Sequence, residues 1–539
     1  MKVNKKKSYN FASAGNECLS EAYRILHCYV RFMFKKYKLG RLNRDVFHYC
    51  PHYIKYSDHL TAGIIIARQA SLNGEIEIFY TSSGCNEIDI LLKKFLRKNY
   101  RINLSFVKNF KQNNRNYYKP FKVNFFKSVK DIIFDLRAYN GGNIKKLNNN
   151  SNSFDVLLLT HPYSKLENLG PYNYLTKKLS NFFQENNLIA RNIIPSQIGL
   201  SIFDKLFGSF QIFLKILSIL VNYKYLTFSN INFIISASYR KIYKTKLKKF
   251  LSTKKIKFLI ASYIDMKYEP IYYEAANELG IKYFLYDFSV GYPLKDFRFL
   301  RYVPDVRKFA DVIFFNSIFR MEQYSRALSF KNIKMEILPH ACPQIDFSVS
   351  RRKNIIDNKQ FKIGIVDNMF SEDLILNYED LFSFSKELQK IDINIGLILQ
   401  SKRGELTNII EKLKLSYLYK NFQKGDLSNL KDVNLIVSIG WQGAALKAAF
   451  AFKKPIIFYS KNSYPYEEHT FSFDKNKNLA INTLSRSLWF DQKYLKEKLN
   501  KLIIDKKSFE ITKKSSLMLL DEIGFIEGNI DEYFSKYFI

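Results

Sequence analysis

VSIGWQGAALKAAFAFKKPIIFYS, Val437 to Ser460, is the stretch that decides the fold. A hydrophobic β-like run stops at a Gly-Trp-Gln-Gly turn and restarts as an Ala-rich helix. The helix breaks at Lys-Lys-Pro, and a second β-like run follows. This order of strand, helix and strand predicts a parallel βαβ unit. Ligands of such sheets bind where the strands end, so the glycine turn is the first candidate for a binding site.

The rest of the C-terminal third repeats this alternation. FKIGIVDN (361–368) and INIGLILQSKR (393–403) are strand-like, and a segment with helical periodicity follows each of them. The middle of the chain has the same pattern, with strand-like runs at 154–160, 256–263, 281–288, 310–317 and 334–339. Pro171 and Pro270 begin predicted helices there, and Gly280 ends the second. The pattern indicates an α/β chain whose parallel sheets carry helices on both faces.

Polar segments divide this pattern into domains. GGNIKKLNNNSNS (141–153) is Asn-rich and without periodicity, and SRRKNIIDNKQ (350–360) is charged and lacks a sustained apolar face. We therefore predict an N-terminal α/β extension (1–142), a first Rossmann-like domain (154–349), a second one (355–505) and a C-terminal helical tail (506–539). The extension should itself contain a βαβ unit over 75–106, and the last stretch should pack back across the first domain.

The chain is strongly basic, with 85 Lys and Arg against 49 Asp and Glu, a formal net charge of +36. Such a field attracts phosphates, whether in nucleic acid, anionic lipid or nucleotide-activated substrates. No helix-turn-helix, zinc-finger or RNA-recognition signature is present, so specific nucleic-acid binding is not expected. The chain also lacks Walker, GxGxxG, GxSxG and HExxH sequences, which argues against P-loop ATPases, ordinary dehydrogenases and common hydrolases.

Five widely spaced cysteines without a Cys-x-x-Cys pair favour a reducing compartment, and the basic N-terminus is followed by no apolar signal core. We therefore expect a cytoplasmic protein. The apolar segment from Ile202 to Phe228 is interrupted by Asp204, Lys205 and Lys215, so it should not span a bilayer. It is either a packing helix or a helix that lies in the headgroups of an anionic membrane.

Candidate binding residues lie after the predicted strands of the second domain. Two cations and a glycine turn meet there, and a helix start after the turn would present backbone N–H groups to a nucleotide phosphate. Trp441 would stack on the ligand or wall its pocket, and Gln442 would bind a base or sugar. A Gly-x-x-Gly turn can also be purely structural. The predicted donor-binding residues at these strand ends are Asn368, Lys402, Arg403, Gly440, Trp441, Gln442 and Gly443.

DVNLIVSIGWQGAALKAAFAFKKP (432–455) resembles the donor-domain signature of GT-B glycosyltransferases, in which a strand ending in Ser-x-Gly, a glycine loop and a helix of small residues precede Lys-Pro. ADVIFFNSIFRMEQY (310–324) and KMEILPHACPQIDF (334–347) are similar to the segment that closes the first domain of that family. The likeness is closest to bacterial enzymes that make surface polysaccharide, capsule or O-antigen. It implies two Rossmann-like domains facing a cleft, a nucleotide-sugar donor as substrate, and neither metal nor other cofactor.

In one respect the chain departs from the family. Many members carry a Glu in this helix to bind the donor ribose, whereas Ala448 stands at that place. Glu467 and Glu468 are the predicted substitutes, although either can simply face solvent. The departure leaves a non-catalytic assembly partner with a decayed site as one alternative. Another is a polyol-phosphate transferase or a nucleotide-sugar epimerase on the same fold.

An inverting transfer also needs a base on the acceptor side. His161 and Asp287 follow long strand-like runs of the first domain and are the predicted catalytic residues, with structural capping as the competing explanation. The SSGCNE turn (82–87) holds either an acceptor phosphate or only a helix cap. His48, Cys50 and His52 offer zinc ligands but lack the paired spacing of structural zinc sites, so no metal is predicted. The expected partners are the donor, a glycan or lipid-linked acceptor, and the inner face of the membrane.

Overall fold

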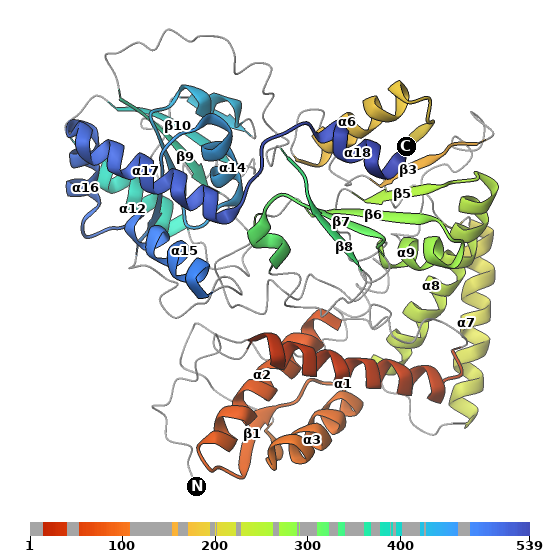
Figure 1. Ribbon diagram of the computed structural model, residues 1–539. Coiled ribbons are helices and arrows are strands. Elements are labelled where there is room, and N and C mark those ends of the chain that lie inside the picture. Colours follow the sequence, from red (N-terminus) through yellow and green to blue (C-terminus); the bar gives the residue numbers. More distant parts are fainter. Residues whose placement is uncertain are drawn as a thin grey trace.

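The structure is a computed structural model of the 539-residue chain (Figure 1). It describes residues 15–39, 53–107, 153–159, 171–193, 200, 202–222, 228–261, 269–287, 290, 310–322, 333–339, 361–367, 378–388, 390–391, 395–401, 421–424, 427–461 and 475–539. These residues form an N-terminal unit and two α/β units, each α/β unit built on its own six-stranded sheet.

The C-terminal sheet is wholly parallel, in the order β11-β10-β9-β12-β13-β14. Its strands are β9 (Phe361–Asp367), β10 (Ile395–Ser401), β11 (Asn421–Lys424), β12 (Leu435–Ile439), β13 (Ile456–Ser460) and β14 (Trp489–Asp491). Numbered within the sheet, this is the order 3-2-1-4-5-6 of a Rossmann fold. The predicted strands at 361–368 and 393–403 and the two in the opening stretch are all confirmed.

Helices cover both faces of this sheet. They are α12 (Tyr378–Leu388), the 3₁₀ helix η6 (Ser428–Asp432), α14 (Gly443–Phe452), α15 (Lys475–Ser487), α16 (Leu495–Ile504) and α17 (Lys506–Ile523). Leu435, Val437 and Ile439 of β12 join the core formed with α12 and α16, while Ile436 joins the core formed with α14, α15 and α17. Because both faces are buried, the strand is hydrophobic at nearly every position instead of alternating.

The middle sheet is also wholly parallel, in the order β4-β3-β5-β6-β7-β8. Its strands are β3 (Val156–Leu159), β4 (Ala190–Ile193), β5 (Phe258–Ala261), β6 (Lys282–Asp287), β7 (Val312–Phe315) and β8 (Lys334–Ile337), and its helices are α6 (Pro171–Glu185), α7 (Ile202–Asn222), α8 (Phe228–Thr253) and α9 (Glu269–Glu278). Numbered within the sheet, the order is 2-1-3-4-5-6, which places this sheet among the doubly wound folds. The prediction of two Rossmann-like domains is therefore confirmed.

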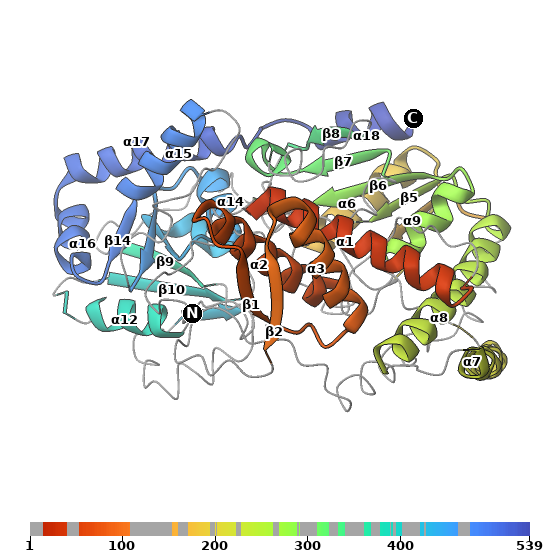
Figure 2. The same cartoon turned by 90° about the horizontal axis from the view of Figure 1, so that it is seen from below.

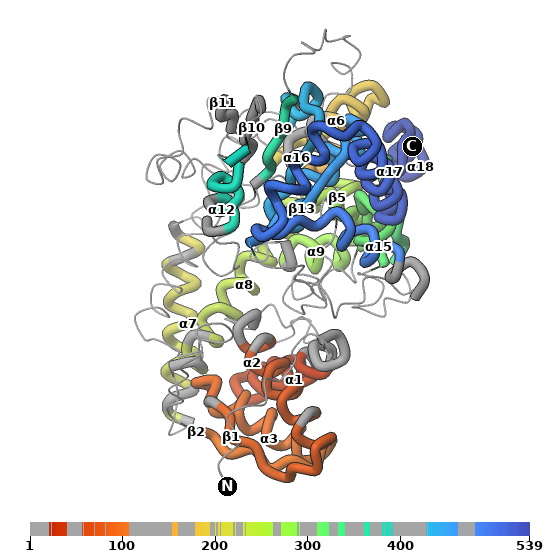
Figure 3. Tube along the Cα trace, turned by 90° about the vertical axis from the view of Figure 1, so that its left-hand side faces the viewer, coloured from red at the N-terminus to blue at the C-terminus, as the bar shows by residue number. Residues whose placement is uncertain are grey.

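The N-terminal unit is a small βαβ unit with two extra helices. It consists of α1 (Gly15–Lys36), α2 (Tyr53–Leu72), β1 (Glu77–Thr81), α3 (Asn86–Tyr100) and β2 (Asn103–Val107), and β1 pairs with β2 in parallel. It packs on the start of α8, where Phe233 meets Tyr29 and Phe34 of α1 edge to face, and Asn230 donates to Glu87 at 2.9 Å. Figure 3 shows α8 reaching from the middle domain down to this unit.

The end of the chain crosses from one domain to the other. After α17, a short segment leads to α18 (Ile530–Phe538), which lies on the middle sheet beside α6 (Figure 1). The Phe538 ring lies 4.6 Å from that of Phe284, 5.5 Å from that of Phe258 and 5.2 Å from that of Phe183. Glu336 on β8 accepts hydrogen bonds from Tyr537 and from Lys536. The prediction that the last stretch packs back across the first domain is confirmed.

The apolar segment from Ile202 onward forms helix α7, which packs on α8 at the edge of the molecule. Many of its large apolar side chains are exposed to solvent, which a packing helix alone does not explain. None of the helices within the described ranges combines the length and the apolar character needed to cross a membrane.

Replacing Phe538 with Ala should loosen α18 without unfolding the chain. The ring is buried, and its loss should reduce the free energy of opening α18 by about 3 kcal/mol, which accelerates hydrogen exchange of the helix amides about a hundredfold. Ile539→Ala, at the exposed neighbouring position, is the matched control and should leave exchange unchanged. Equal exchange in the two variants would show that α18 is not held by this core.

Candidate functional site

The candidate site lies where the order of the C-terminal sheet reverses. β9 is flanked by β10 and β12. The chain adds β10 and β11 on one side of β9, and it then adds β12, β13 and β14 on the other side. Ligands of doubly wound sheets bind outside the carboxyl ends of the strands at such a switch point. β12 ends at Ile439 and is followed by the turn Gly440, Trp441, Gln442 and Gly443. The turn singled out in the sequence therefore stands at the position where the fold places ligands.

Backbone conformation and hydrogen bonds fix the turn. Gly440 has φ of +68°, a left-handed conformation that residues with a Cβ seldom adopt. Its N–H donates to the carbonyl of Tyr459 at 2.8 Å, and its own carbonyl accepts from the Ser438 hydroxyl at 2.6 Å. The strand end, the turn and the neighbouring strand β13 thus form one rigid unit.

The two side chains of the turn point into the protein. Trp441 is buried, stacked on Phe458 with ring centroids 5.1 Å apart and meeting Phe319 edge-on at 6.5 Å. Gln442 is fully buried, and its Nε2 donates to the carbonyl of Ile439 at 2.8 Å. Its Oε1 has no hydrogen-bond partner among the described residues. A buried acceptor in that state costs free energy until a donor reaches it.

Helix α14 starts at this turn and has no side-chain cap. Gln442 occupies the N-cap position, and within the described residues no side chain accepts from the first-turn N–H groups. The carbonyl of Gln442 accepts the first helical bond, from the N–H of Leu446 at 3.1 Å. The three N–H groups before Leu446, together with the helix dipole, give this end of α14 a partial positive charge that suits a phosphate.

The carboxyl edge of the middle sheet carries a buried ion pair. Asp287, the last residue of β6, accepts from Arg320 at 3.2 and 3.3 Å, and both side chains are buried. Asn316, directly after β7, accepts from Tyr286 at 2.5 Å through Oδ1, while its Nδ2 has no partner among the described residues. Neither Asn316 nor Arg320 was singled out in the sequence: Asn316 lies near the end of the strand-like run predicted over 310–317, and Arg320 lies three residues beyond it.

The two carboxyl edges meet at a small contact. A Cβ added to Gly443 would lie 3.3 Å from the Val290 side chain, so glycine allows the start of α14 to approach the loop after β6. Ser317 donates to the carbonyl of Val290 at 3.1 Å, and the N–H of Ile318 donates to the carbonyl of Gly524 at 3.1 Å. Gly440 to Gly443, Asp287 and Arg320 are therefore brought to the same junction between the two sheets.

Several predicted site residues lie outside the described part of the chain. They are His161, Asn368, Lys402, Arg403, Glu467 and Glu468. The strands that precede four of them are described: His161 follows β3, Asn368 follows β9, and Lys402 and Arg403 follow β10. Ser401 at the end of β10 pairs with Asp367 at the end of β9. Asn368, Lys402 and Arg403 thus follow neighbouring strand ends at the switch point. Their roles, like those of the turn residues and of Asp287, stay predictions.

Ala448 is fully buried, in the core between α14 and α17. A side chain at this position packs against other apolar groups. Alanine, which replaces the glutamate expected from the family pattern, suits this apolar environment. Its neighbour Lys447 is also buried. The ribose contact that the resemblance implied for this position therefore has no carboxylate to make it.

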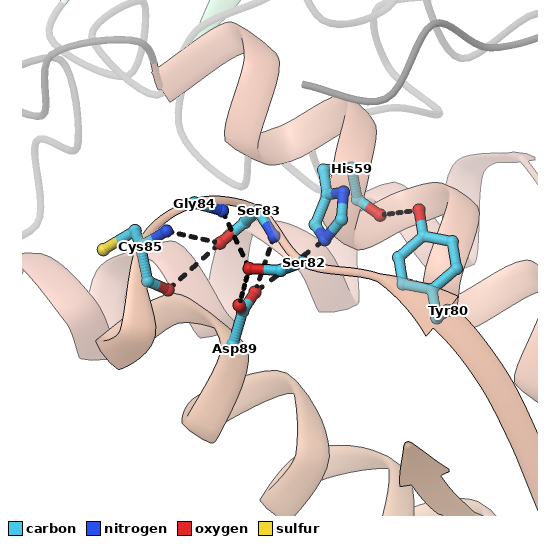
Figure 4. A network of polar contacts seen from close by, with 7 residues as sticks. All are labelled: His59, Tyr80, Ser82, Ser83, Gly84, Cys85 and Asp89. Atoms are coloured by element: carbon cyan, nitrogen blue, oxygen red, sulfur yellow. Dashed lines mark hydrogen bonds and ion pairs between the residues drawn. The ribbon is translucent and has the colours of Figure 1, made fainter. Parts of the chain in front are cut away.

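The SSGCNE turn of the N-terminal unit binds its own helix (Figure 4). Asp89 of α3 accepts from the Ser83 N–H at 2.9 Å and from the Ser82 hydroxyl at 2.5 Å. The N–H groups of Gly84 and Cys85 donate to the Ser82 and Ser83 hydroxyls at 3.0 and 3.1 Å. These N–H groups are occupied by the turn itself, which argues against an acceptor-phosphate site on them. The predicted Ser cap is wrong, because the N-cap of α3 is Cys85 and no side-chain cap hydrogen bond is made.

Two titratable groups beside this turn are buried. Burial lowers the pKa of His59 to about 4, with its Nε2 4.0 Å from Asp89, and burial raises the pKa of the Cys85 thiol to about 12. The Cys85 thiol is therefore protonated and unreactive at neutral pH. In the described ranges, no three His, Cys, Asp or Glu side chains are grouped so that they could hold a metal ion. His48, Cys50 and His52, the possible zinc ligands considered in the sequence, lie outside those ranges.

No protein-family model and no curated protein sequence matches the chain. Similar solved structures include a UDP-bound MnaA of S. aureus (12% identity, 71% of this chain and 95% of that one, TM-score 0.40). Others are a MurG of Acinetobacter baumannii (11%, 71% and 98%, 0.37) and a UDP-GlcNAc 2-epimerase of Neisseria meningitidis with UDP-GlcNAc (12%, 71% and 98%, 0.41). At these TM-scores the likenesses carry no argument about function, and the assignment of two Rossmann-like domains follows from the strand orders.

His59 should make the N-terminal unit sensitive to mild acid. Its pKa is about 4 in the folded chain and about 6.5 when exposed, so the unfolded state binds the extra proton and stability falls as pH drops from about 6.5 to 4. The loss across that window should approach about 3 kcal/mol. Burial raises the pKa of Asp89, which gives a pH dependence of opposite sign.

Comparing wild type with His59→Gln isolates the histidine. The measurement is hydrogen exchange of α2 and α3 between pH 7 and pH 4, corrected for the intrinsic exchange rate. The variant should lose the acid-dependent part of the opening free energy, whatever its stability at pH 7. If the opening free energy of the variant depended on pH as steeply as that of wild type, His59 would not be the cause of the acid sensitivity.

Proposed function

We propose that this protein is a GT-B glycosyltransferase that moves a sugar from a nucleotide-activated donor to a surface polysaccharide or lipid-linked glycan acceptor. The reaction uses neither a metal nor another cofactor, because fixed positive charge of the protein stabilises the departing phosphate. The enzyme works in the cytoplasm, in peripheral contact with the anionic inner face of the membrane. Capsule and O-antigen are the acceptor classes that the sequence resemblance favours.

One observation carries the proposal. The Gly440–Gly443 turn lies at the switch point of a Rossmann sheet. Helix α14 starts at this turn without a side-chain cap, and the adjacent Gln442 has an Oε1 with no partner among the described residues. A site for a nucleotide diphosphate or monophosphate needs backbone N–H groups for the phosphate and a polar group for the sugar or base. The turn offers both, and it faces the carboxyl edge of the other sheet through Val290.

The proposed roles follow from position and charge. The N–H groups at the start of α14 bind the leaving phosphate. Lys402 and Arg403 follow β10, which β9 separates from β12, and they neutralise the negative charge that develops on the phosphate. Gln442 and Asn368 bind the sugar or base, and the buried Trp441 holds the turn from behind. Since Ala448 offers no carboxylate, Glu467 or Glu468 binds the donor ribose.

His161 or Asp287 takes the proton of the acceptor hydroxyl. Two buried hydrogen bonds from Arg320 already engage the Asp287 carboxylate, so it is less available to an acceptor hydroxyl. His161 follows β3, which adjoins β5 at the point where the order of the middle sheet reverses. His161 is therefore the better candidate for the base, and Asp287 with Arg320 shapes the acceptor side.

A second candidate is a non-catalytic assembly partner, which the buried Ala448 favours because that position lacks the ribose-binding carboxylate. Such a protein would keep the two-domain fold without affinity for a donor. The two candidates differ in whether any sugar nucleotide stabilises the chain.

A thermal-shift screen with CMP-, UDP-, GDP- and dTDP-sugars separates them. One donor class should raise the melting temperature, since a ligand at a hundred times its Kd stabilises by about 2.7 kcal/mol. Lys402→Ala and Gln442→Met should each weaken donor binding about tenfold, because each removes a group that pairs with the ligand. Lys496→Ala, at an exposed position of α16, is the matched control and should bind like wild type.

Stabilisation that survives both site substitutions would place the pocket elsewhere. No stabilisation by any donor would favour the assembly partner. A product assay with the stabilising donor then distinguishes sugar transfer from epimerisation or transfer of a polyol phosphate.

A further inference from the structure

Helix α7 turns its apolar side outward. At spacings of three and four residues, one face carries exposed apolar side chains: Phe203, Leu206, Phe207, Phe210, Phe213, Leu214, Leu217 and Val221. Phe203 is 77% exposed and Val221 86%, so the exposed row runs along nearly the whole helix. Helices of globular proteins normally bury such a stripe, and a contiguous exposed one marks an interaction surface.

The opposite side of α7 is built to pack on α8. A Cβ added to Gly208 would lie 2.8 Å from the Ile242 side chain, so the two helices approach closely there. Ser209 bonds to Tyr239, and Lys246 pairs with Asp204. These contacts set the rotation of α7 about its own axis, so the outward direction of the phenylalanines is determined by specific packing.

The exposed row lies at the periphery of the molecule. α7 forms the right-hand edge in Figure 1, and in Figure 2 it is seen end-on, outside α8 and away from both sheets. A flat partner can therefore reach the row without disturbing either domain.

The hairpin of α7 and α8 is strongly basic in sequence, and Asp204 in the first turn of α7 is its one acidic residue. From Lys205 to Ile264 the chain has no Asp or Glu, and it has twelve Lys and Arg: Lys205, Lys215, Lys224, Arg240, Lys241, Lys244, Lys246, Lys248, Lys249, Lys254, Lys255 and Lys257. Asp204 of α7 pairs with Lys246, and carboxylates from elsewhere in the chain pair with Lys244, Lys248 and Lys257. Lys241, Lys249 and Lys255 are exposed. Exposed apolar rings beside exposed cations are the two features that bind a helix to anionic lipid.

We propose that the α7–α8 hairpin docks this protein on an anionic lipid bilayer, with α7 lying in the plane of the headgroups. Phe207, Phe210 and Phe213 enter the boundary of the acyl chains, and the exposed lysines of α8 meet the lipid phosphates. With 21 residues, α7 covers about 31 Å of the surface. Lys215, near the middle of the helix, is compatible with this orientation and not with a span.

A second copy of the chain is the competing occupant of this face, and charge disfavours it. A two-fold contact would bring two of these cationic hairpins together, and the one acid in each, Asp204, is already paired with Lys246. An anionic bilayer supplies both the apolar volume and the opposite charge. The inference rests on the proposed function only in assigning an acceptor to the membrane, because lipid binding itself needs no donor.

The test is co-sedimentation of the full chain with vesicles, without sugar nucleotide. We expect binding to vesicles of mixed phosphatidylcholine and phosphatidylglycerol, and much weaker binding to phosphatidylcholine alone or at high salt. Phe207→Ser with Phe213→Ser should weaken binding about tenfold, because two exposed rings no longer enter the lipid. The matched control is Ile511→Ser with Met518→Ser, two exposed apolar positions on α17, and it should bind like wild type.

A second pair of variants tests the charge. Lys241→Gln with Lys249→Gln should weaken binding about fivefold per lysine, whereas Lys506→Gln with Lys514→Gln on α17 should change it much less. Equal loss in the α7 and α17 variants, or no binding by wild type, would overturn the proposal. So would a wild-type dimer that the α7 variant converts to a monomer. Vesicle binding by a chain that no sugar nucleotide stabilises would keep this inference and reject only the transferase.

Discussion

The candidate site depends on one small contact between the two Rossmann-like domains. Val290, in the loop after β6, lies against Gly443, and Phe319 meets the edge of Trp441. These apolar contacts hold the carboxyl edges of two separate sheets at one junction, and the glycine permits the distance. Donor groups and acceptor groups come from different domains in the proposed reaction. Their geometry is therefore set by this contact, together with the hydrogen bond from Ile318 to Gly524 and the packing of α18 on the middle sheet.

The backbone of the fold was largely predictable, and the side chains of the site were not. Strands such as β9, β12 and β13 are buried on both faces, so their unbroken apolar runs identify them in the sequence. Edge strands β4, β11 and β14 were not predicted, because their sequences ARNI, NFQK and WFD are short and include polar residues, so none forms an apolar run of strand length. At the turn, the sequence located Gly440 correctly at a strand end. It could not show that Gln442 is buried, or that Arg320 pairs with Asp287, because both depend on contacts between distant segments.

Helix α8 shows why the rotation of a helix is difficult to predict from sequence. Its first turns hold the N-terminal unit through Phe233, its middle holds α7 through Ile242, and Lys244 binds Glu274 of α9. With neighbours on several sides, it has no single apolar stripe to recognise. For α7 the stripe was clear, but the usual rule that it faces inward is wrong here. The side of α7 that packs on α8 is held instead by Gly208, by the Ser209 hydroxyl and by the Asp204 carboxylate.

The position of α18 sets the order in which the chain can mature during synthesis. The middle sheet is complete at Ile337, yet the part of one face beside α6 stays uncovered until Phe534 and Phe538 have left the ribosome. During the interval the ribosome makes the whole C-terminal sheet, while the nascent middle domain exposes Phe284 and its neighbours. Aggregation is a risk in that interval, and a chaperone that shields this face would have its main effect then.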